Sequence, residues 1–211
     1  MKIEFVSDVA CPWCAIGLHS LEQALQALGP DVPVALSFQP FELNPTLGPE
    51  GADTVAYLTE KYGITAAQVA QNQAAIRERG AAVGFTFGTR GRVWNTFDAH
   101  RLLCWAETVG PAEQRALKHA LLAAYHGEGR NPADPAVLVE LAVQAGLDGE
   151  LARQVLASDA HADEVREREQ FWQRAGIRSV PAVVINRQQL ISGGQPPEVF
   201  EQALRQIAAA G

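Results

Sequence analysis

A Cys-Pro-Trp-Cys motif at residues 11–14 lies between a strand pattern and a helix pattern, and this placement constrains the fold most strongly. Before the motif, Ile3 and Phe5 alternate with charged residues, as in a short strand. After it, leucines recur at helical spacing as far as Leu28, which precedes a Gly-Pro helix stop. Alternating apolar residues at 32–38 then predict a second strand. This N-terminal segment therefore predicts a βαβ unit with the motif at the N-terminus of its helix.

The C-terminal end predicts a second unit, of two strands and a helix. Residues 182–185 form a continuous apolar run, which suits a strand buried on both faces. Leu190 and Ile191 begin another short strand after a polar turn, and apolar residues from Val199 to Ile207 are spaced as in an amphipathic helix. This segment is therefore expected to be ββα.

The middle of the chain is alanine-rich and shows helical periodicity. Thr65 and Gln68 form a capping-box pattern at the start of one predicted helix. Further helices are expected to start near Pro111 and Asp134, at about 151–156, and at about 161–175.

The two end units can share one sheet only if this helical region is an insertion that returns to its starting point. The sequence thus predicts an α/β thioredoxin-like fold, a βαβ + ββα sheet interrupted by a helical insertion domain. Residues 1–43 and 176–211 are assigned to the thioredoxin-like domain, and residues 44–175 to the inserted helical domain.

Composition and charge argue against several functional classes. Of 211 residues, 47% are apolar and 19% charged, as in a globular protein able to bury a sizeable core. The formal net charge of -7 gives no basic footprint for nucleic acid or an anionic membrane. No stretch approaches the roughly 20 apolar residues that cross a bilayer, and no signal-peptide core follows Met1. We therefore expect a cytoplasmic protein with no nucleic-acid or membrane partner, if the sequence begins at its natural start.

The cysteines at 11, 14 and 104 indicate redox chemistry. A thiolate is the attacking species in disulfide exchange, and a helix N-terminus lowers the pKa of a thiol there. Cys11 precedes the helix and is the expected nucleophile, Cys14 lies one turn further in and is the expected resolving thiol, and Pro12 suits the first helical turn. A zinc site is the alternative, but Cys104 is alone and the histidines are scattered, so no metal is expected. Cys104 itself lies in an apolar helical stretch and is expected to be a buried, inert thiol.

A second candidate element is Val180-Pro181, directly before the apolar run at 182–185. Proline cannot donate to a strand ladder, so its position here is unusual. Either a cis Val180–Pro181 bond marks a tight turn held for a purpose, or a trans proline merely starts the strand. The ββα unit that follows favours the first interpretation.

Together these features resemble the DsbA-like thioredoxin superfamily, especially its cytosolic FrnE-type branch, which is related to kappa-class glutathione transferases and 2-hydroxychromene-2-carboxylate isomerases. The resemblance covers essentially the full chain. The segments that carry it are Cys11-Pro12-Trp13-Cys14, Phe41-Glu42-Leu43-Asn44-Pro45, Asn95-Thr96-Phe97-Asp98-Ala99-His100-Arg101 and Ser179-Val180-Pro181.

The resemblance implies a cis Val180–Pro181 bond that faces the cysteine pair, with the Val180 backbone pairing with an extended substrate such as a peptide or glutathione. It also implies that Gly193 and Gly194 lie near a site for the γ-glutamyl end of glutathione. A glycine-rich turn that opens a helix can offer N–H groups to a carboxylate. A tight turn before the last helix is the alternative interpretation.

Two departures from relatives matter. Kappa-type transferases and the isomerases use serine where this chain has Cys11, so a cysteine pair favours reversible disulfide formation over simple glutathione activation. Periplasmic DsbA usually has histidine where this chain has Trp13, so an oxidant role does not follow from the resemblance. Trp13 is expected to be partly exposed and to offer substrate an apolar surface.

Further substrate-binding candidates are Asn44, Trp94 and His100. The functional interpretation places the segment from Trp94 to His100 on the substrate face, with His100 available for proton transfer. In the structural alternative, Asp98 caps a helix and Arg101 pairs across it. Aromatic residues expected in the core are Tyr125, Phe171 and Trp172.

The predicted function is a thiol–disulfide oxidoreductase that forms a mixed disulfide on Cys11 and resolves it with Cys14. Two alternatives are a glutathione-dependent transferase or isomerase acting on an aromatic or polyketide-like molecule, and a non-catalytic binding module. No tightly bound cofactor is expected. Glutathione, as a co-substrate, or a disulfide of a small molecule or protein is the expected partner, and a second copy of the chain in a homodimer is a further candidate.

Overall fold

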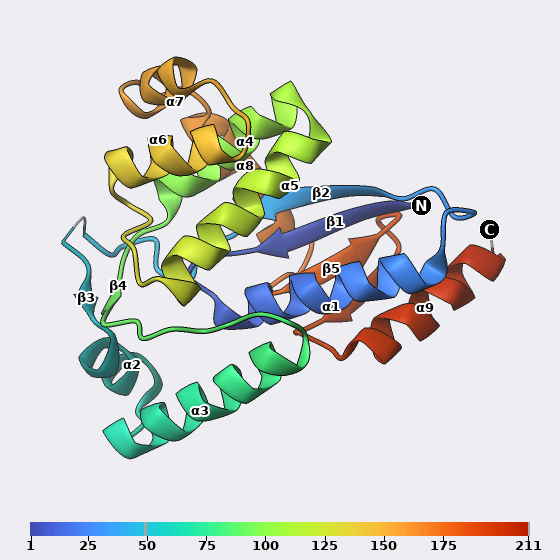
Figure 1. The fold of residues 1–211 in the computed structure, drawn as a ribbon, viewed down its shortest axis with the longest axis horizontal. Coiled ribbons are helices and arrows are strands. Elements are labelled where there is room, and N and C mark those ends of the chain that lie inside the picture. The colour runs from blue at the N-terminus through green and yellow to red at the C-terminus, as the bar shows by residue number, and fades with distance from the viewer. Residues whose placement is uncertain (49, 211) are drawn as a thin grey trace.

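The computed structural model describes residues 1–48 and 50–210, and a four-stranded sheet lies at its centre (Figure 1). Its strands are β1 (Lys2–Ser7), β2 (Ala35–Pro40), β5 (Ala182–Ile185) and β6 (Gln189–Ser192), in the order β2-β1-β5-β6. β1 pairs parallel with β2 and antiparallel with β5, and β5 pairs antiparallel with β6. The two ends of the chain thus share one sheet, in the mixed α/β thioredoxin-like fold that the sequence predicts.

Helices pack on both sides of this sheet (Figure 1). On one side α1 (Pro12–Leu28) lies beside α9 (Pro197–Ala210). The elements between β2 and β5 are β3 (Ala52–Asp53), α2 (Thr54–Tyr62), α3 (Ala66–Ala82), β4 (Arg92–Val93), α4 (Phe97–Val109), α5 (Pro111–Leu122), the π-helical turn η1 (Ala123–Gly127), α6 (Pro135–Gln144), α7 (Gly149–Leu156) and α8 (Ala162–Arg174). β3 and β4 form a small antiparallel sheet.

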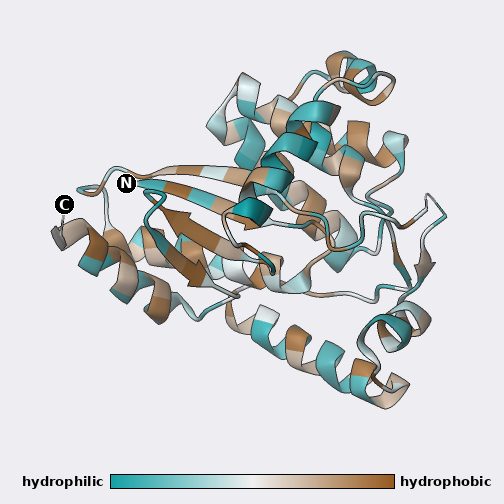
Figure 2. Ribbon diagram, turned by 180° about the vertical axis from the view of Figure 1, so that it is seen from behind, coloured by the Kyte–Doolittle hydropathy of each residue, from teal (hydrophilic) through white to brown (hydrophobic). Residues whose placement is uncertain are grey.

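Two large apolar clusters hold these layers together. One joins the central strands to α1 and α9, and it includes Phe5, Cys14 and Phe200. Among these strands, β5 is hydrophobic along its whole length (Figure 2). The other lies among helices α4 to α7 and includes Tyr125, which is fully buried. Val9 and Ala10, just before the cysteine pair, belong to this second cluster. The turn that carries the cysteines is therefore fixed by both clusters.

Most predicted elements are present, with shifted boundaries. The strand predicted at 32–38 is β2 and begins at Ala35, after Pro33, which has no N–H to give to the ladder. The capping box of α3 is formed: Gln68 N–H donates to Thr65 Oγ1 at 3.2 Å, and Gln68 Oε1 accepts from Thr65 N–H at 2.8 Å. Asp134 caps α6, as predicted. Helix α2 and the β3–β4 pair were not predicted from the sequence.

The structural alternative for Asp98 and Arg101 holds in part, and one expectation about the core was wrong. Asp98 does not cap α4, because Asn95 Oδ1 accepts the Phe97 N–H at 2.8 Å and Asp98 instead pairs with Arg101 at 2.8 Å. Phe171 is not a core residue: 40% of it is exposed, because it lies on the outer face of α8 beneath the guanidinium of Arg187.

Among the described residues, no helix is both long and apolar enough to cross a membrane.

Candidate active site

Cys11 is the N-cap residue of α1, directly after the turn that follows β1. The N–H of Cys14 donates to the carbonyl oxygen of Cys11 at 3.0 Å, and Pro12 occupies the first helical turn. Both cysteines are free thiols; Cys11 is 4% exposed and Cys14 is fully buried. A reagent that reaches the pair therefore meets Cys11 first.

The two thiols differ in acidity. The Cys14 thiol donates to Cys11 Sγ, and this bond, helped by backbone N–H groups of Cys14 and Trp13, lowers the pKa of Cys11 although burial and the charge of Asp8 oppose it. Burial raises the pKa of Cys14 well above its usual range, and Cys11 raises it further. The arrangement therefore favours a thiolate on Cys11 over one on Cys14. By contrast, burial raises the pKa of Cys104 to about 12, as an inert thiol requires.

The loop before β5 contacts the cysteine pair. The Val180–Pro181 bond is cis, in agreement with the family resemblance, and the Cys11 thiol donates to the Val180 carbonyl oxygen at 3.5 Å. Pro181 packs so closely on α1 that a Cβ atom at Gly17 would lie 2.9 Å from its Cγ. The Val180–Pro181 segment therefore packs directly against the N-terminal turns of α1.

Gly193 and Gly194 lie beside this loop. The Gly193 N–H donates to the carbonyl oxygen of Pro181 at 2.8 Å, so this N–H is already used within the protein. A Cβ atom at Gly194 would lie 2.9 Å from the carbonyl oxygen of Trp13, which explains why the smallest residue stands there. Both glycines are thus brought to the start of α1.

Asp8 is a buried carboxylate that ties the cysteine turn to two other segments. It accepts hydrogen bonds from the N–H groups of Ala10 (3.0 Å) and Leu43 (2.7 Å). It also accepts one from Thr96 Oγ1 at 2.7 Å, and His100 Nε2 lies 3.4 Å away. Burial alone would raise its pKa, but its bonds and the charge of His100 outweigh burial and lower it. Asp8 is therefore an ionised anchor behind the turn.

His100 and Trp94 are placed differently from the expectation that their segment faces the substrate. His100 is 1% exposed and points at Asp8. Trp94 packs edge-on against Tyr125 with ring centroids 6.0 Å apart. Within residues 1–48 and 50–210, neither lines the cavity that contains Cys11.

Lys118, on α5, is a buried cation that sequence reasoning missed. It is fully buried, and its Nζ has no hydrogen-bond partner in the described part of the chain. One helical turn further along, Leu122 packs in the same cluster as Cys11 and Cys14. Burial lowers the pKa of Lys118, whereas the nearby Cys14, Asp8 and Cys11 raise it. A positive charge here stabilises thiolates of the pair.

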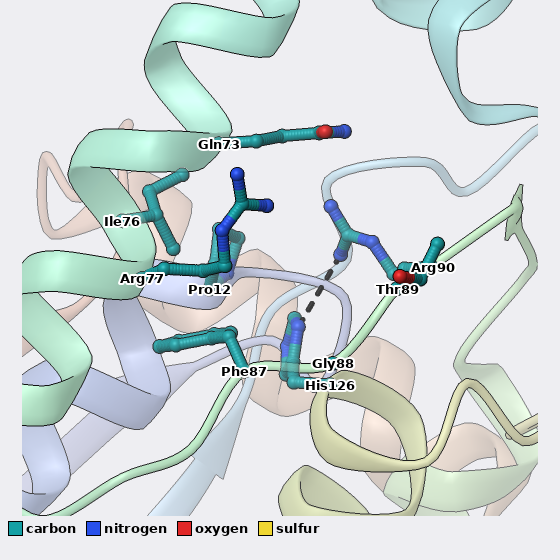
Figure 3. Close-up of a pocket in the computed structure, with 9 residues that line it drawn as sticks. All are labelled: Pro12, Gln73, Ile76, Arg77, Phe87, Gly88, Thr89, Arg90 and His126. Carbon is teal, nitrogen blue, oxygen red and sulfur yellow. Dashed lines mark hydrogen bonds between the residues drawn. The ribbon is translucent and has the colours of Figure 1, made fainter.

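His126, in η1, is a second missed residue and it holds the turn before Cys11. Its Nε2 lies 2.8 Å from the Val9 carbonyl oxygen, and its Nδ1 lies 3.4 Å from Arg90 Nη1 (Figure 3). Nε2 therefore carries the proton and Nδ1 accepts from the guanidinium. Burial, and then Arg90, lowers its pKa well below the usual range, which keeps the ring neutral. Arg90 Nη1 also donates to the Ala10 carbonyl oxygen at 3.2 Å.

A cavity of about 530 Å³ opens in front of Cys11. Three predicted site residues line it with Cys11: Pro12, Trp13 and Asn44. Its far side is formed by mainly apolar residues of α2, α3 and the loop between them: Tyr57, Leu58, Tyr62, Ile64, Val69 and Ile76. Asn44 Oδ1 accepts from Tyr57 Oη at 2.8 Å and from Lys61 Nζ at 2.6 Å, which fixes the side chain at the edge of the cavity.

Signals for the missed residues were present but weak. Lys118 interrupts an apolar helical face that includes Leu121 and Leu122, where a charge needs a reason. Asp8 directly follows the first strand, a position from which a side chain reaches the cysteine turn. Nothing in the local sequence marks Arg90 or His126. Within the described part of the chain, no three His, Cys, Asp or Glu side chains group as metal ligands would.

Comparisons with known proteins agree with this fold. The family model of the DSBA-like thioredoxin domain matches residues 2–205. A crystal structure described as a probable DsbA oxidoreductase from Streptomyces coelicolor has a TM-score of 0.91 and 39% identity over 98% of this chain and 89% of its own. The cytosolic disulfide reductase DsbM from Pseudomonas aeruginosa, solved with GSH, has a TM-score of 0.68 and 16% identity over 99% and 100% of the two chains. A 2-hydroxychromene-2-carboxylate isomerase has a TM-score of 0.69 and 15% identity over 99% and 96%. The last two likenesses concern the fold alone.

Proposed function

This chain belongs to the family of DSBA-like thioredoxin domains, and from that premise we propose that it is a thiol–disulfide oxidoreductase. Cys11 is the nucleophile and Cys14 the resolving thiol. The observation that carries the proposal is the difference between them: Cys11 has a lowered pKa and borders a cavity, while Cys14 is fully buried with a raised pKa.

The proposed reaction starts from the dithiol form. The Cys11 thiolate attacks one sulfur of a substrate disulfide, the substrate S–S bond breaks, and one substrate thiolate leaves. Cys14 then loses its proton and attacks Cys11 Sγ. This second step forms the Cys11–Cys14 disulfide and releases the second substrate thiolate, so the substrate disulfide is reduced by two electrons and the protein dithiol is oxidised. Because each step is reversible, the same residues oxidise a substrate dithiol when the pair starts as a disulfide.

Neighbouring groups support each step. The helix N-terminus and the buried charge of Lys118 favour the thiolate that attacks and leaves. The Val180 carbonyl oxygen lies 3.5 Å from Cys11 Sγ, and in this proposal it accepts an N–H of an extended substrate. Trp13, which is 38% exposed, offers an apolar surface beside the reacting sulfur.

Glutathione, or the disulfide of a small molecule or protein, is the partner in this proposal, with no tightly bound cofactor. Glutathione disulfide supplies a substrate for the first step, and glutathione thiol returns the pair to the dithiol form. A cytoplasmic location is part of the proposal, since an odd number of cysteines suits a reducing compartment.

A Cys14→Ser variant tests the mechanism. When it is incubated with glutathione disulfide, mass spectrometry should find glutathione attached to Cys11, because the resolving thiol is absent. Turnover of a disulfide substrate should fall at least about 100-fold. The matched control, Cys104→Ser, removes a buried thiol outside the site and should leave turnover and adduct formation unchanged. The mechanism is refuted if Cys14→Ser turns over at the wild-type rate.

A glutathione-dependent transferase or isomerase is the second candidate. The mainly apolar cavity beside Cys11 favours it, because a redox step alone needs no cavity of about 530 Å³. This candidate predicts that Cys14→Ser keeps full activity toward an aromatic small molecule. The oxidoreductase proposal predicts the opposite, so the same variant separates the two.

A further inference from the structure

Two guanidinium groups face one another at the end of the Cys11 cavity. Arg77 comes from α3 and Arg90 from the segment before β4, and both line a small cavity of about 60 Å³ together with Gln73 and His126 (Figure 3). Neither guanidinium forms an ion pair with a carboxylate of residues 1–48 or 50–210. Two like charges that share a cavity repel one another, and a bound anion would relieve this repulsion.

Arg90 is held in a fixed orientation. Its Nη1 bonds the Ala10 carbonyl oxygen at 3.2 Å and His126 Nδ1 at 3.4 Å, and its guanidinium lies 5.0 Å from the centre of the Tyr125 ring. Figure 3 shows another nitrogen of this group pointing away from His126. His126 adds no charge, because its ring is neutral. Arg90 thus offers an anion a positioned donor, whereas Arg77 is exposed and can adjust to it.

The small cavity adjoins the larger one. Pro12, Ile76 and Arg90, along with Gln73, line both of them. A molecule whose disulfide reaches Cys11 and whose body fills the apolar space can therefore place an anionic group between Arg77 and Arg90. The small cavity, at about 60 Å³, has room for an anionic group but not for a second aromatic ring.

We propose that Arg77 and Arg90 form an anion subsite that selects small disulfides with an apolar or aromatic body and a carboxylate group. This inference rests on the proposed function, since Cys11 has to attack the disulfide that the subsite positions. A small molecule fits better than a protein loop, because Cys11 is only 4% exposed and lies at the wall of a recessed cavity.

Two aromatic disulfides that differ in charge test the proposal: 5,5′-dithiobis(2-nitrobenzoate), which carries carboxylates, and 4,4′-dithiodipyridine, which is neutral. Each releases a coloured thiol when Cys11 attacks it. The reaction is followed by stopped flow in the Cys14→Ser protein, where the mixed disulfide persists and one thiol leaves per chain. For each probe, the rate constant of a variant is divided by that of the parent protein, so intrinsic differences between the probes cancel.

Replacing Arg77 should slow only the carboxylate probe. We expect Arg77→Gln to lower its rate about threefold and Arg77→Glu about tenfold, with the neutral probe changed less than about twofold. Added salt should slow the carboxylate reaction of the parent protein and leave the neutral reaction unchanged. The matched control is Arg79→Gln, which removes the same charge from α3 but lines neither cavity, and both probes should react with it at the parent rate.

The outcomes are distinguishable. Equal slowing of both probes by Arg77→Gln, or no slowing of the carboxylate probe by Arg77→Glu, overturns the anion subsite while the redox function stands. Failure of both probes to react with Cys11 in the Cys14→Ser protein overturns the proposed function and the subsite with it.

Discussion

Buried polar side chains lie behind the cysteine pair, whereas α2 and α3 in front of it present mainly apolar side chains to an open cavity. We define the buried wall as four of these buried side chains, Asp8, His100, Lys118 and His126. The cavity-facing residues of α2 and α3 form the open wall. Asp8 and His126 hydrogen-bond to the backbone of the cysteine turn, and His100 contacts Asp8. The fourth member, Lys118, has no hydrogen-bond partner for its Nζ among the described residues. The open wall makes few polar contacts.

This difference separates two tasks. Charges act strongly where water is excluded, so the buried wall controls the acidity and the position of the thiols. Apolar side chains that remain accessible gain from covering a ligand, so the open wall controls which molecule reaches Cys11. Changes to the buried wall should therefore alter stability and acidity for every substrate, and changes to the open wall should alter rates for particular substrates.

The largest effect is expected at Asp8. The two carboxylate oxygens of Asp8 accept from the N–H groups of Ala10 and Leu43. In Asp8→Asn an N–H₂ group replaces one of these oxygens, so one of the two backbone N–H groups loses its acceptor. We expect a loss of about 3 kcal/mol in the free energy of unfolding, measured by urea denaturation. Asp98→Asn, which removes a half-exposed carboxylate, is the control and should cost less than about 1 kcal/mol.

The same variant should also change how the free energy of unfolding depends on pH. The pKa of Asp8 is lowered in the folded protein, so its stabilisation is present above the usual range of a carboxyl group and is lost as pH falls through the folded pKa. Asp8→Asn should lack this part of the acid destabilisation. An unfolding free energy equal to that of the wild type at neutral pH would contradict the role given to Asp8.

A smaller effect, on acidity and not on folding, is expected at Lys118. Lys118→Met removes the buried charge and keeps the side-chain length, so the pKa of Cys11 should rise by about one unit, equivalent to about 1.4 kcal/mol. Alkylation of Cys11 near neutral pH should then slow about tenfold, and the glutathione equilibrium should shift toward the disulfide. Stability should not fall, because an unpartnered buried ammonium is costly.

Arg115→Met is the control for Lys118, since it removes a positive charge from an exposed position on the same helix. It should leave the alkylation rate unchanged. If Lys118→Met also leaves the pH profile of Cys11 alkylation unchanged, the cation does not act on the pair.

The smallest effect is expected on the open wall. Ile76→Ser removes apolar surface from the cavity and should weaken the binding of an aromatic disulfide about threefold, read as a higher KM with unchanged kcat. Val199→Ser, at an exposed position on α9 outside this cavity, is the control. Equal KM values for Ile76→Ser and the wild type would show that α3 does not contact the substrate.

The sequence was most informative where the information is local. Strand alternation, leucine spacing and the capping box of Thr65 each depend on neighbours within a few residues, so β1, α1 and α3 could be predicted. Helix α2 was missed, because it has only nine residues and its apolar side chains line a cavity instead of packing into a core. Likewise β3 and β4 are two residues each, and their pairing is defined only in three dimensions.

The same limit applies to the site. Cys11, Cys14 and Pro12 carry a motif, so sequence spacing alone predicts their proximity. Lys118 and His126 reach the pair from the end of α5 and from η1, more than one hundred residues away along the chain. Their approach follows from how the helices pack, which no local pattern encodes.

The contact between Gly17 and Pro181 has a consequence for how the two chain ends are aligned. A Cβ atom at Gly17 would lie 2.9 Å from Pro181 and one at Gly194 2.9 Å from the Trp13 carbonyl oxygen, so both contacts depend on a hydrogen atom in place of a side chain. Steric fit of this kind does not respond to acidity or ionic strength. The loop that faces the reacting sulfur should therefore keep its place across every ionisation state of the pair. In an engineered chain, a larger residue at position 17 or 194 would displace this loop even if every ionisable group were retained.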